Sequence, residues 1–238
     1  MPLLTSIISW LQTRRMEQIK YYYTNPYEVQ AETLSKLLEF ADGTQWGKKH
    51  SFSKINSYTD FKNSMPVSDY NALKPYINRV MEGEKNVLWP TNIKWFAKSS
   101  GTTEDKSKYI PVSQESQEDC HFRGGKDVYA IYTSLNPETT VYSGKALALG
   151  GSHKPHQQNF DIFSGDLSAI LIQNLPFWFE FTRTPNLAIT LMDEWEKKID
   201  LIATETIKEN VTHLAGVPSW TLVLFKRILE ITGKSSIK

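Results

Sequence analysis

In the N-terminal part of the chain, apolar residues recur every three or four positions, which is the spacing of an amphipathic helix. This pattern predicts helices over Leu3–Tyr22 and Val29–Phe40, and we interpret the following Gly43–Lys48 as a turn. Two shorter helices are predicted over Ser57–Met65 and Pro75–Met81, the second with proline at its first position. The chain up to about residue 85 is therefore expected to be a helical lead-in.

Between residues 95 and 112 the pattern changes to two short apolar runs on either side of a polar turn. Trp95–Ala97 and Tyr109–Val112 have the aromatic and β-branched content of half-buried strands. The turn between them contains Ser99, Ser100, Gly101, Thr102 and Thr103. We expect the order strand, loop, strand, followed by a helix that Ser113 caps and that extends to about Tyr132.

The composition of this turn suits a polyphosphate ligand. Gly101 permits a backbone conformation that aims successive N–H groups at one point. The hydroxyls can donate hydrogen bonds to phosphate oxygens, and Lys106 or Lys108 can add a positive charge. The same composition also fits an ordinary polar hairpin loop, so the residues alone leave two interpretations open.

The helix predicted after the loop contains two adjacent glycines, Gly124 and Gly125. Relative to two alanines they cost about 2 kcal/mol in a helix. Either the helix breaks there, or something approaches its backbone closely, and a ligand is one candidate.

The C-terminal part alternates between short apolar runs and helical patterns. The predicted elements are strands over Thr139–Ser143, Lys145–Leu149 and His213–Val217 and helices over Pro185–Asn210 and Trp220–Ile231. Phe177, Trp178, Phe179 and Phe181 form an aromatic cluster, for which packing in the core is the expected explanation.

Composition and charge exclude several functional classes. The chain has 238 residues with 40% apolar content, which is ample for a packed core. Lys and Arg number 27 against 26 Asp and Glu, so neither nucleic acid nor a membrane surface is an expected partner. His153 and His156 make a poor zinc site beside a single cysteine, so no metal site is expected in the protein itself.

The same features predict a cytoplasmic protein. Cys120 is the only cysteine, which excludes an intrachain disulfide framework and fits a reducing compartment. The apolar N-terminal patch lacks the preceding basic residues and the cleavage site of a signal peptide. No run approaches the roughly 18 apolar residues that a membrane span needs.

One stretch carries a family resemblance. Ser99-Ser-Gly-Thr-Thr103, followed by Lys108-Tyr-Ile-Pro111, resembles the first motif of the Gretchen Hagen acyl-acid amido synthetases, the auxin-responsive promoter family of adenylate-forming enzymes. The chain departs from that motif at Asp105, where the family usually has a second glycine. An acidic side chain beside a polyphosphate causes repulsion unless Mg²⁺ or a lysine offsets it.

The resemblance implies an α/β fold that is the N-terminal portion of the large adenylating domain, with a mixed sheet and flanking helices. Residues 1–238 would form this incomplete domain, with the helical lead-in at about 1–85 and the phosphate loop and following sheet and helix region at about 86–238. The implied reaction uses ATP and Mg²⁺. A carboxylate attacks the α-phosphate to give an acyl-adenylate and pyrophosphate, and the amine of an amino acid then displaces AMP.

The resemblance also assigns site residues. The phosphates would bind to Ser99, Ser100, Gly101, Thr102, Thr103 and Lys108. In the family the helix after the motif lines the acyl pocket, so Arg123 and its neighbour His121 are candidates for binding the carboxylic acid. No general base is identifiable.

Two later family motifs, one implicated in magnesium binding and one that holds the ribose, are absent from the chain. The resemblance therefore implies part of an amido synthetase that needs the missing C-terminal half of the enzyme. The alternative is a non-catalytic nucleotide- or phosphate-binding module, or an inactive relative.

Overall fold

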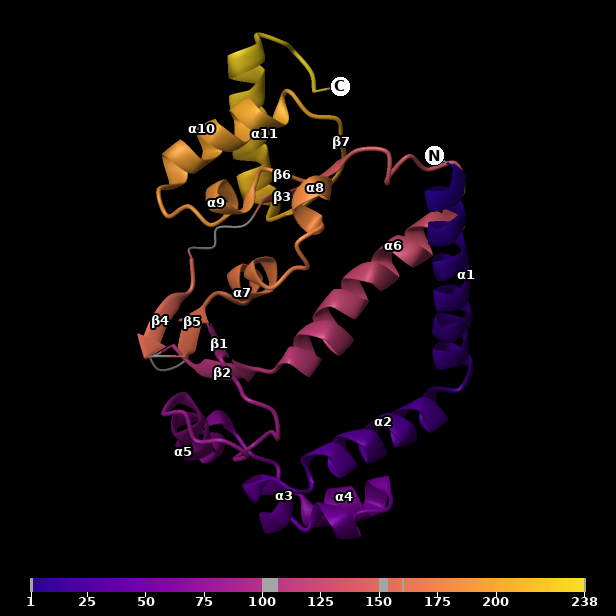
Figure 1. Cartoon of the computed structure of the whole chain (residues 1–238), viewed down its shortest axis with the longest axis vertical. Coiled ribbons are helices and arrows are strands. Elements are labelled where there is room, and N and C mark those ends of the chain that lie inside the picture. The colour runs from indigo at the N-terminus through magenta and orange to yellow at the C-terminus, as the bar shows by residue number, and fades with distance from the viewer. Residues whose placement is uncertain (1, 100–106, 150–153, 160, 238) are drawn as a thin grey trace. The chain divides into compact units, whose positions relative to one another are not determined.

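The computed structural model of the chain describes residues 2–99, 107–149, 154–159 and 161–237, and Figure 1 shows its path. Contacts divide the chain into two units. Unit 1 consists of Met1–Pro137 with Gln158–Ile162, and unit 2 of Glu138–Gln157 with Phe163–Lys238. The mixture of helices and short strands confirms the predicted α/β class. Within the described ranges, no helix has both the length and the apolar character needed to cross a bilayer.

The first two predicted helices are confirmed. They extend over Pro2–Thr24 (α1) and Pro26–Ala41 (α2). A 3-10 helix, η1, follows at Phe52–Lys54, and α4 occupies Tyr58–Ser64. All regular elements of the described residues up to 85 are helical.

The interpretation of Gly43–Lys48 as a turn is wrong. A short helix, α3, forms over Gln45–Lys49, because the hydroxyl oxygen of Thr44 accepts a hydrogen bond from the Gly47 N–H at 2.9 Å. The glycine is needed for close packing, since a Cβ at position 47 would lie 2.3 Å from the carbonyl oxygen of Ala41.

The helix predicted to begin at Pro75 begins five residues earlier. It extends over Tyr70–Met81 (α5), with Pro75 inside it. Proline inside a helix removes one backbone hydrogen bond. The Asp69 carboxylate accepts a hydrogen bond from the Ala72 N–H at 2.8 Å and thereby stabilises the N-terminus of the helix.

In unit 1, α1 packs against α6 (Arg123–Leu135), as Figure 1 shows. Arg15 of α1 forms a two-pronged ion pair with Asp127 of α6, with distances of 2.6 Å from Nε to Oδ1 and 2.7 Å from Nη2 to Oδ2. The hydrogen bond to Asp127 raises the pKa of Arg15, so this pair stays charged and fixes α1 on α6.

The strands predicted around the polar turn are confirmed. β1 (Trp95–Lys98) and β2 (Tyr109–Val112) form an antiparallel hairpin. The sheet has the strand order β2-β1-β5-β4, in which β5 is Ile162–Gly165 and β4 is His156–Asn159. Because β2 lies at an edge, its outward N–H groups must find partners outside the sheet.

A buried cluster supports this hairpin. It consists of Ile77, Val80, Val87, Ile93, Phe96 and Ile162. Phe96 of β1 is completely buried. Tyr70 and Trp89 are partly buried and pack against the cluster, and Trp89 also contacts a second cluster that includes Leu38 and Phe52.

The helix predicted after the hairpin is confirmed, with one irregularity. Ser113 caps it as predicted, because its Oγ accepts a hydrogen bond from the Ser116 N–H at 3.0 Å. The first part is a π-helix, η2, over Ser116–Phe122, which passes directly into α6. The helix therefore does not break at Gly124 and Gly125.

Unit 2 contains a three-stranded parallel sheet with helices. The strands, in the order β6-β3-β7, are Arg183–Thr184, Lys145–Leu149 and Val211–Gly216. The helices are Leu167–Gln173 (α7), Phe179–Thr182 (α8), Leu187–Thr190 (α9), Trp195–Thr206 (α10) and Pro218–Thr232 (α11). The predicted helix over Pro185–Asn210 is thus two helices, α9 and α10.

The core of unit 2 consists of buried apolar residues from its strands and helices. They are Leu147, Leu149, Ile189, Ile199, Ile202, Ala203, Leu224 and Ile228.

The strand predicted over Thr139–Ser143 is wrong, and the segment forms turns. Both the backbone N–H and the hydroxyl of Ser143 donate to the Thr140 carbonyl, at 2.8 and 2.7 Å. Such local bonds of hydroxyl side chains favour turns over strands. The strand predicted over His213–Val217 is present as β7, but its C-terminal half is exposed and not buried.

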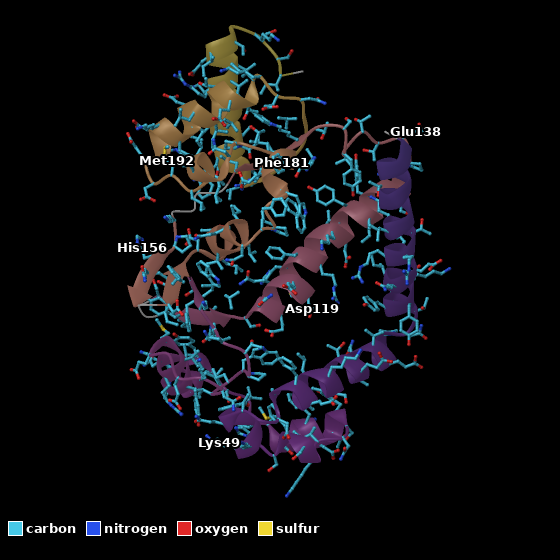
Figure 2. The ribbon with its side chains drawn as sticks, in the orientation of Figure 1. Lys49, Asp119, Glu138, His156, Phe181 and Met192 are labelled. Carbon is cyan, nitrogen blue, oxygen red and sulfur yellow. The ribbon has the colours of Figure 1, made fainter. Side chains whose placement is uncertain are left out.

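The prediction that the aromatic cluster packs in the core is also wrong for three of its members. Phe177, Trp178 and Phe181 are 75%, 56% and 74% exposed, and Figure 2 labels Phe181 at α8. The rings of Phe177 and Trp178 contact each other edge to face at 5.4 Å. A local cluster of aromatic residues therefore did not indicate burial.

Candidate functional site

The mouth of the β1–β2 hairpin is closed by a pair of hydrogen bonds. Lys98 lies opposite Tyr109 in the ladder, and the next residues outward are Ser99 and Lys108. The Ser99 N–H donates to the Lys108 carbonyl at 2.9 Å, and the Lys108 N–H donates to the Ser99 Oγ at 3.1 Å. The remaining predicted phosphate ligands, Ser100, Gly101, Thr102 and Thr103, lie outside the described residues, as does Asp105.

Lys108 is half-buried at this mouth, and its ammonium group lies over an aromatic ring. The distance from Lys108 Nζ to the ring centroid of Tyr70 is 5.6 Å. The hydroxyl of the same tyrosine accepts a hydrogen bond from the Tyr109 N–H at 2.9 Å. Among the residues that the structure describes, no carboxylate pairs with Lys108. A positive charge at this position can attract an anion such as phosphate.

The structure places the two predicted substrate-binding residues on different sides of one helix. His121 is half-buried in η2, whereas Arg123 is exposed and forms an ion pair with Asp119 one turn away. Side chains two residues apart on a helix point in roughly opposite directions. The two residues therefore do not meet each other, and their binding of an acid stays a prediction.

The two glycines of α6 face open space. Apart from the neighbouring backbone of the helix itself, no atom of the described residues would lie within 4 Å of a Cβ built at Gly124 or Gly125. We therefore expect Gly124→Ala and Gly125→Ala each to raise the free energy of unfolding by about 0.5–1 kcal/mol, because alanine loses less backbone freedom in a helix. Urea unfolding followed by circular dichroism measures this change.

The matched control is Gly47→Ala, which should destabilise the chain because the new methyl group would collide with the Ala41 carbonyl. A loss of stability in the Gly124→Ala variant would contradict the open surroundings of α6 and would restore the prediction of a close approach there.

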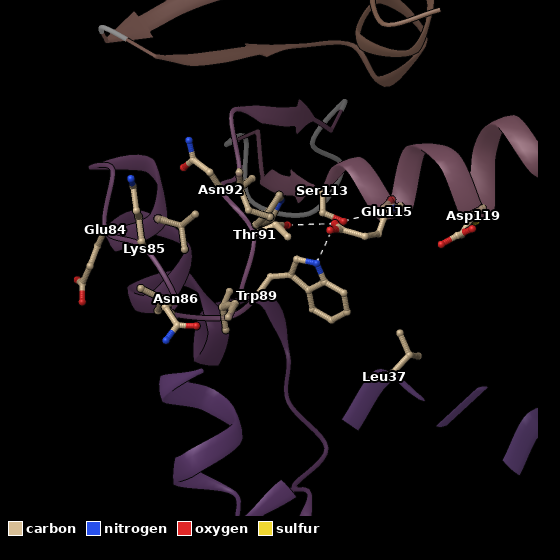
Figure 3. A pocket seen from close by; sticks show the side chains of 17 residues that line it. Leu37, Glu84, Lys85, Asn86, Trp89, Thr91, Asn92, Ser113, Glu115 and Asp119 are labelled. Atoms are coloured by element: carbon tan, nitrogen blue, oxygen red, sulfur yellow. Dashed lines mark hydrogen bonds between the residues drawn. The ribbon is translucent and has the colours of Figure 1, made fainter. Parts of the chain in front are cut away.

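A cavity of about 440 Å³ lies elsewhere in unit 1, and Figure 3 shows its lining. Its walls include Leu37, Val80, Trp89, Pro111, Glu115 and Asp119. The carboxylates of Glu84, Glu115 and Asp119 line it together with one lysine, Lys85. Glu84 is paired with Arg79, and Asp119 with Arg123. Among the described residues, the lining does not include Ser99 or Lys108, so the cavity is distinct from the hairpin mouth.

Glu115 is a polar group of this cavity that two neighbouring side chains hold in place. Its Oε2 accepts hydrogen bonds from Trp89 Nε1 at 3.0 Å and from the Thr91 hydroxyl at 3.1 Å, drawn as dashed lines in Figure 3. Burial alone would raise the pKa of Glu115, but these bonds, with those from its own backbone N–H and Ser113, outweigh burial and lower the pKa. No sequence signal pointed to this cluster, because Trp89 and Glu115 are far apart in the chain and belong to no motif.

The comparison with known proteins decides the family. The family profile described as "GH3 family N-terminal domain" matches residues 15–238. The chain belongs to the GH3 family. This result confirms the resemblance to the acyl-acid amido synthetases that the loop motif indicated.

Several other GH3 proteins are similar to this chain. Jasmonoyl-L-amino acid synthetase JAR6 of Nicotiana attenuata is 30% identical over 177 residues, which cover 70% of this chain. Indole-3-acetic acid-amido synthetase GH3.10 of Arabidopsis thaliana is 34% identical over 100 residues, which cover 39% of this chain and 17% of that protein.

A solved structure of the same family has the same fold. GH3.15 acyl acid amido synthetase in complex with 2,4-DB matches 92% of this chain with a TM-score of 0.72 at 19% identity. The GH3 chain described here is much shorter than its relatives. It covers 28% of JAR6 and 38% of the GH3.15 chain, and it corresponds to their N-terminal part.

Proposed function

We propose that this chain is the part of an ATP-dependent acyl-acid amido synthetase that binds the phosphates of ATP. One observation carries the proposal: the hairpin mouth holds the ammonium group of Lys108 and the hydroxyl of Ser99 at the two ends of the motif segment. Membership of a family whose named members are amido synthetases supports it. Ser100, Gly101, Thr102 and Thr103 would add N–H and hydroxyl donors, and their part rests on the motif alone.

The reaction that we propose has two steps. An oxygen of the carboxylic acid attacks the α-phosphorus of ATP, and the bond to the bridging oxygen breaks, which gives an acyl-adenylate and pyrophosphate. The amine of an amino acid then attacks the acyl carbon and releases AMP. Lys108 would offset the negative charge that develops on the leaving pyrophosphate, an electrostatic role that is effective when the cation is already in place.

Mg²⁺ would enter as the counter-ion of ATP. We treat the metal as part of the substrate, because Mg²⁺ commonly binds proteins together with substrate phosphates. The acid and the amino acid would be small molecules, and Arg123 or His121 would help to bind them. The enzyme would be cytoplasmic. Because the relatives are longer, complete turnover would also require the C-terminal part that they possess.

Lys108→Ala is the variant that tests this proposal. Loss of a charge-assisted hydrogen bond costs about 1–3 kcal/mol, so we expect the affinity for Mg·ATP or Mg·pyrophosphate to fall roughly 5- to 150-fold. Isothermal titration calorimetry on the purified chain measures the change. Lys36→Ala is the control, because Lys36 is 78% exposed on α2 and pairs with Glu32 of the same helix.

Equal binding by a folded Lys108→Ala variant and the parent chain would refute the proposed phosphate site. Asp105 favours a second candidate, an inactive relative of the amido synthetases, because a carboxylate in this loop opposes phosphate binding. Acid-dependent release of pyrophosphate on incubation with ATP, Mg²⁺ and a panel of carboxylic acids would mark an enzyme. Binding of ATP without release would mark a binding module, or a chain that needs the C-terminal part of its relatives.

A further inference from the structure

We infer that Tyr70, which lies outside the loop motif, is the positioning residue for Lys108, and thus determines how well the hairpin mouth binds phosphate. The inference rests on the proposed function. Tyr70 contacts the hairpin twice: its ring lies beneath the Lys108 ammonium group at 5.6 Å, and its hydroxyl accepts the N–H of Tyr109, the next residue, at 2.9 Å.

The hydroxyl contact fixes the backbone at the base of Lys108. β2 lies at the edge of its sheet, so an N–H group that points away from β1 has no partner strand. The hydroxyl of Tyr70 provides that partner for Tyr109. Lys108 is then fixed from two directions, because its own N–H is bonded to Ser99 on the side of β1.

The ring contact orients the side chain. A lysine has a flexible four-carbon stem and loses much rotational freedom when its ammonium group is held by a ligand. An aromatic face attracts a cation, so the ring of Tyr70 restricts the ammonium group before the phosphate binds. Part of the conformational entropy that the Lys108 side chain loses on binding is therefore already lost in the free protein. This increases affinity without a new contact to the ligand.

Tyr70 is itself held by the rest of unit 1. It is the first residue of α5, whose N-terminus is capped by Asp69. Its ring packs against the buried cluster that contains Ile77 and Phe96. A residue anchored by a capped helix and a core is a rigid support, unlike another loop residue.

Three variants separate the two contacts. Tyr70→Phe keeps the ring and removes the hydroxyl, whereas Tyr70→Leu and Tyr70→Met remove both and retain apolar bulk for the core. We expect Tyr70→Leu and Tyr70→Met to weaken binding of Mg·pyrophosphate about 3- to 10-fold, and Tyr70→Phe about 2-fold. Isothermal titration calorimetry at a temperature where each variant is folded gives the affinities.

A double-mutant cycle distinguishes positioning from a general structural role. If Tyr70 acts through Lys108, Tyr70→Leu has no further effect on pyrophosphate affinity when Lys108 is already alanine. A merely structural role would lower affinity in both backgrounds. The same affinity in Tyr70→Leu as in the parent chain, or an equal loss with and without Lys108, overturns the inference.

A second measurement, the NMR spectrum of the parent chain, needs neither a ligand nor a folded variant. In the parent chain, the ring of Tyr70 should shift the proton resonances of the Lys108 side chain away from those of exposed lysines. Unshifted Lys108 resonances overturn the inference even if every Tyr70 variant fails to fold. If instead Lys108→Ala leaves binding unchanged while the resonances are shifted, the proposed phosphate site fails and the contact with Tyr70 stands.

Discussion

Replacing Phe96 by alanine is expected to lower the free energy of unfolding by about 3–5 kcal/mol, the range for large-to-small changes of a buried aromatic residue. Phe96 is completely buried in β1 and packs in the cluster with Ile77, Val87 and Ile162. Its removal takes away the apolar area that the ring buries and leaves a cavity that the surrounding strands and helix can fill only in part.

Urea unfolding followed by circular dichroism and tryptophan fluorescence measures this loss. Phe181→Ala is the matched control, because Phe181 is 74% exposed and its truncation should change stability by no more than about 0.5 kcal/mol. Similar losses of stability in both variants would show that Phe96 is not part of the packed core of unit 1.

Ile202→Ala is expected to have the second largest effect, a loss of about 2–5 kcal/mol. Ile202 is completely buried in α10 and belongs to the cluster that joins this helix to β3 and α11, including Leu147 and Leu224. Alanine favours helix slightly more than isoleucine does, so the measured loss underestimates the lost packing by a few tenths of a kcal/mol.

Ile207→Ala provides the comparison for that variant. Ile207 follows the last turn of α10 and is 40% exposed, so the same change of side chain removes little buried area. Differential scanning calorimetry of the two variants should show a much larger drop in Tm for Ile202→Ala. A larger drop for Ile207→Ala would contradict the observed packing of unit 2.

Local patterns predicted those elements whose signals lie within a few residues. The helices α1 and α2 followed from apolar spacing. The helix predicted over Trp220–Ile231 is α11, which begins at Pro218 and ends before Gly233, a residue in the left-handed conformation with φ of 65°. The start of α5 was missed because Pro75 was taken as a beginning, whereas the carboxylate cap at Asp69 stabilises a helix that accommodates the proline.

Features that depend on distant contacts could not be predicted in the same way. The exposure of Phe177, Trp178 and Phe181 depends on what packs against α8, which apolar content alone does not reveal. At the candidate site, Ser99 and Lys108 were found from the loop motif. Tyr70 was not found, because it joins the hairpin across 39 residues of chain and has no composition signal of its own.

The closed mouth of the β1–β2 hairpin has a consequence for how this protein can change over evolutionary time. Among the described residues, β1 and β2 are paired by bonds between residues 95–99 and 108–112, which end in the mutual bonds of Ser99 and Lys108. We therefore expect the fold to tolerate a substitution such as an aspartate at 105. Descendants of one scaffold can in this way retune or abandon ligand chemistry through single mutations while remaining folded.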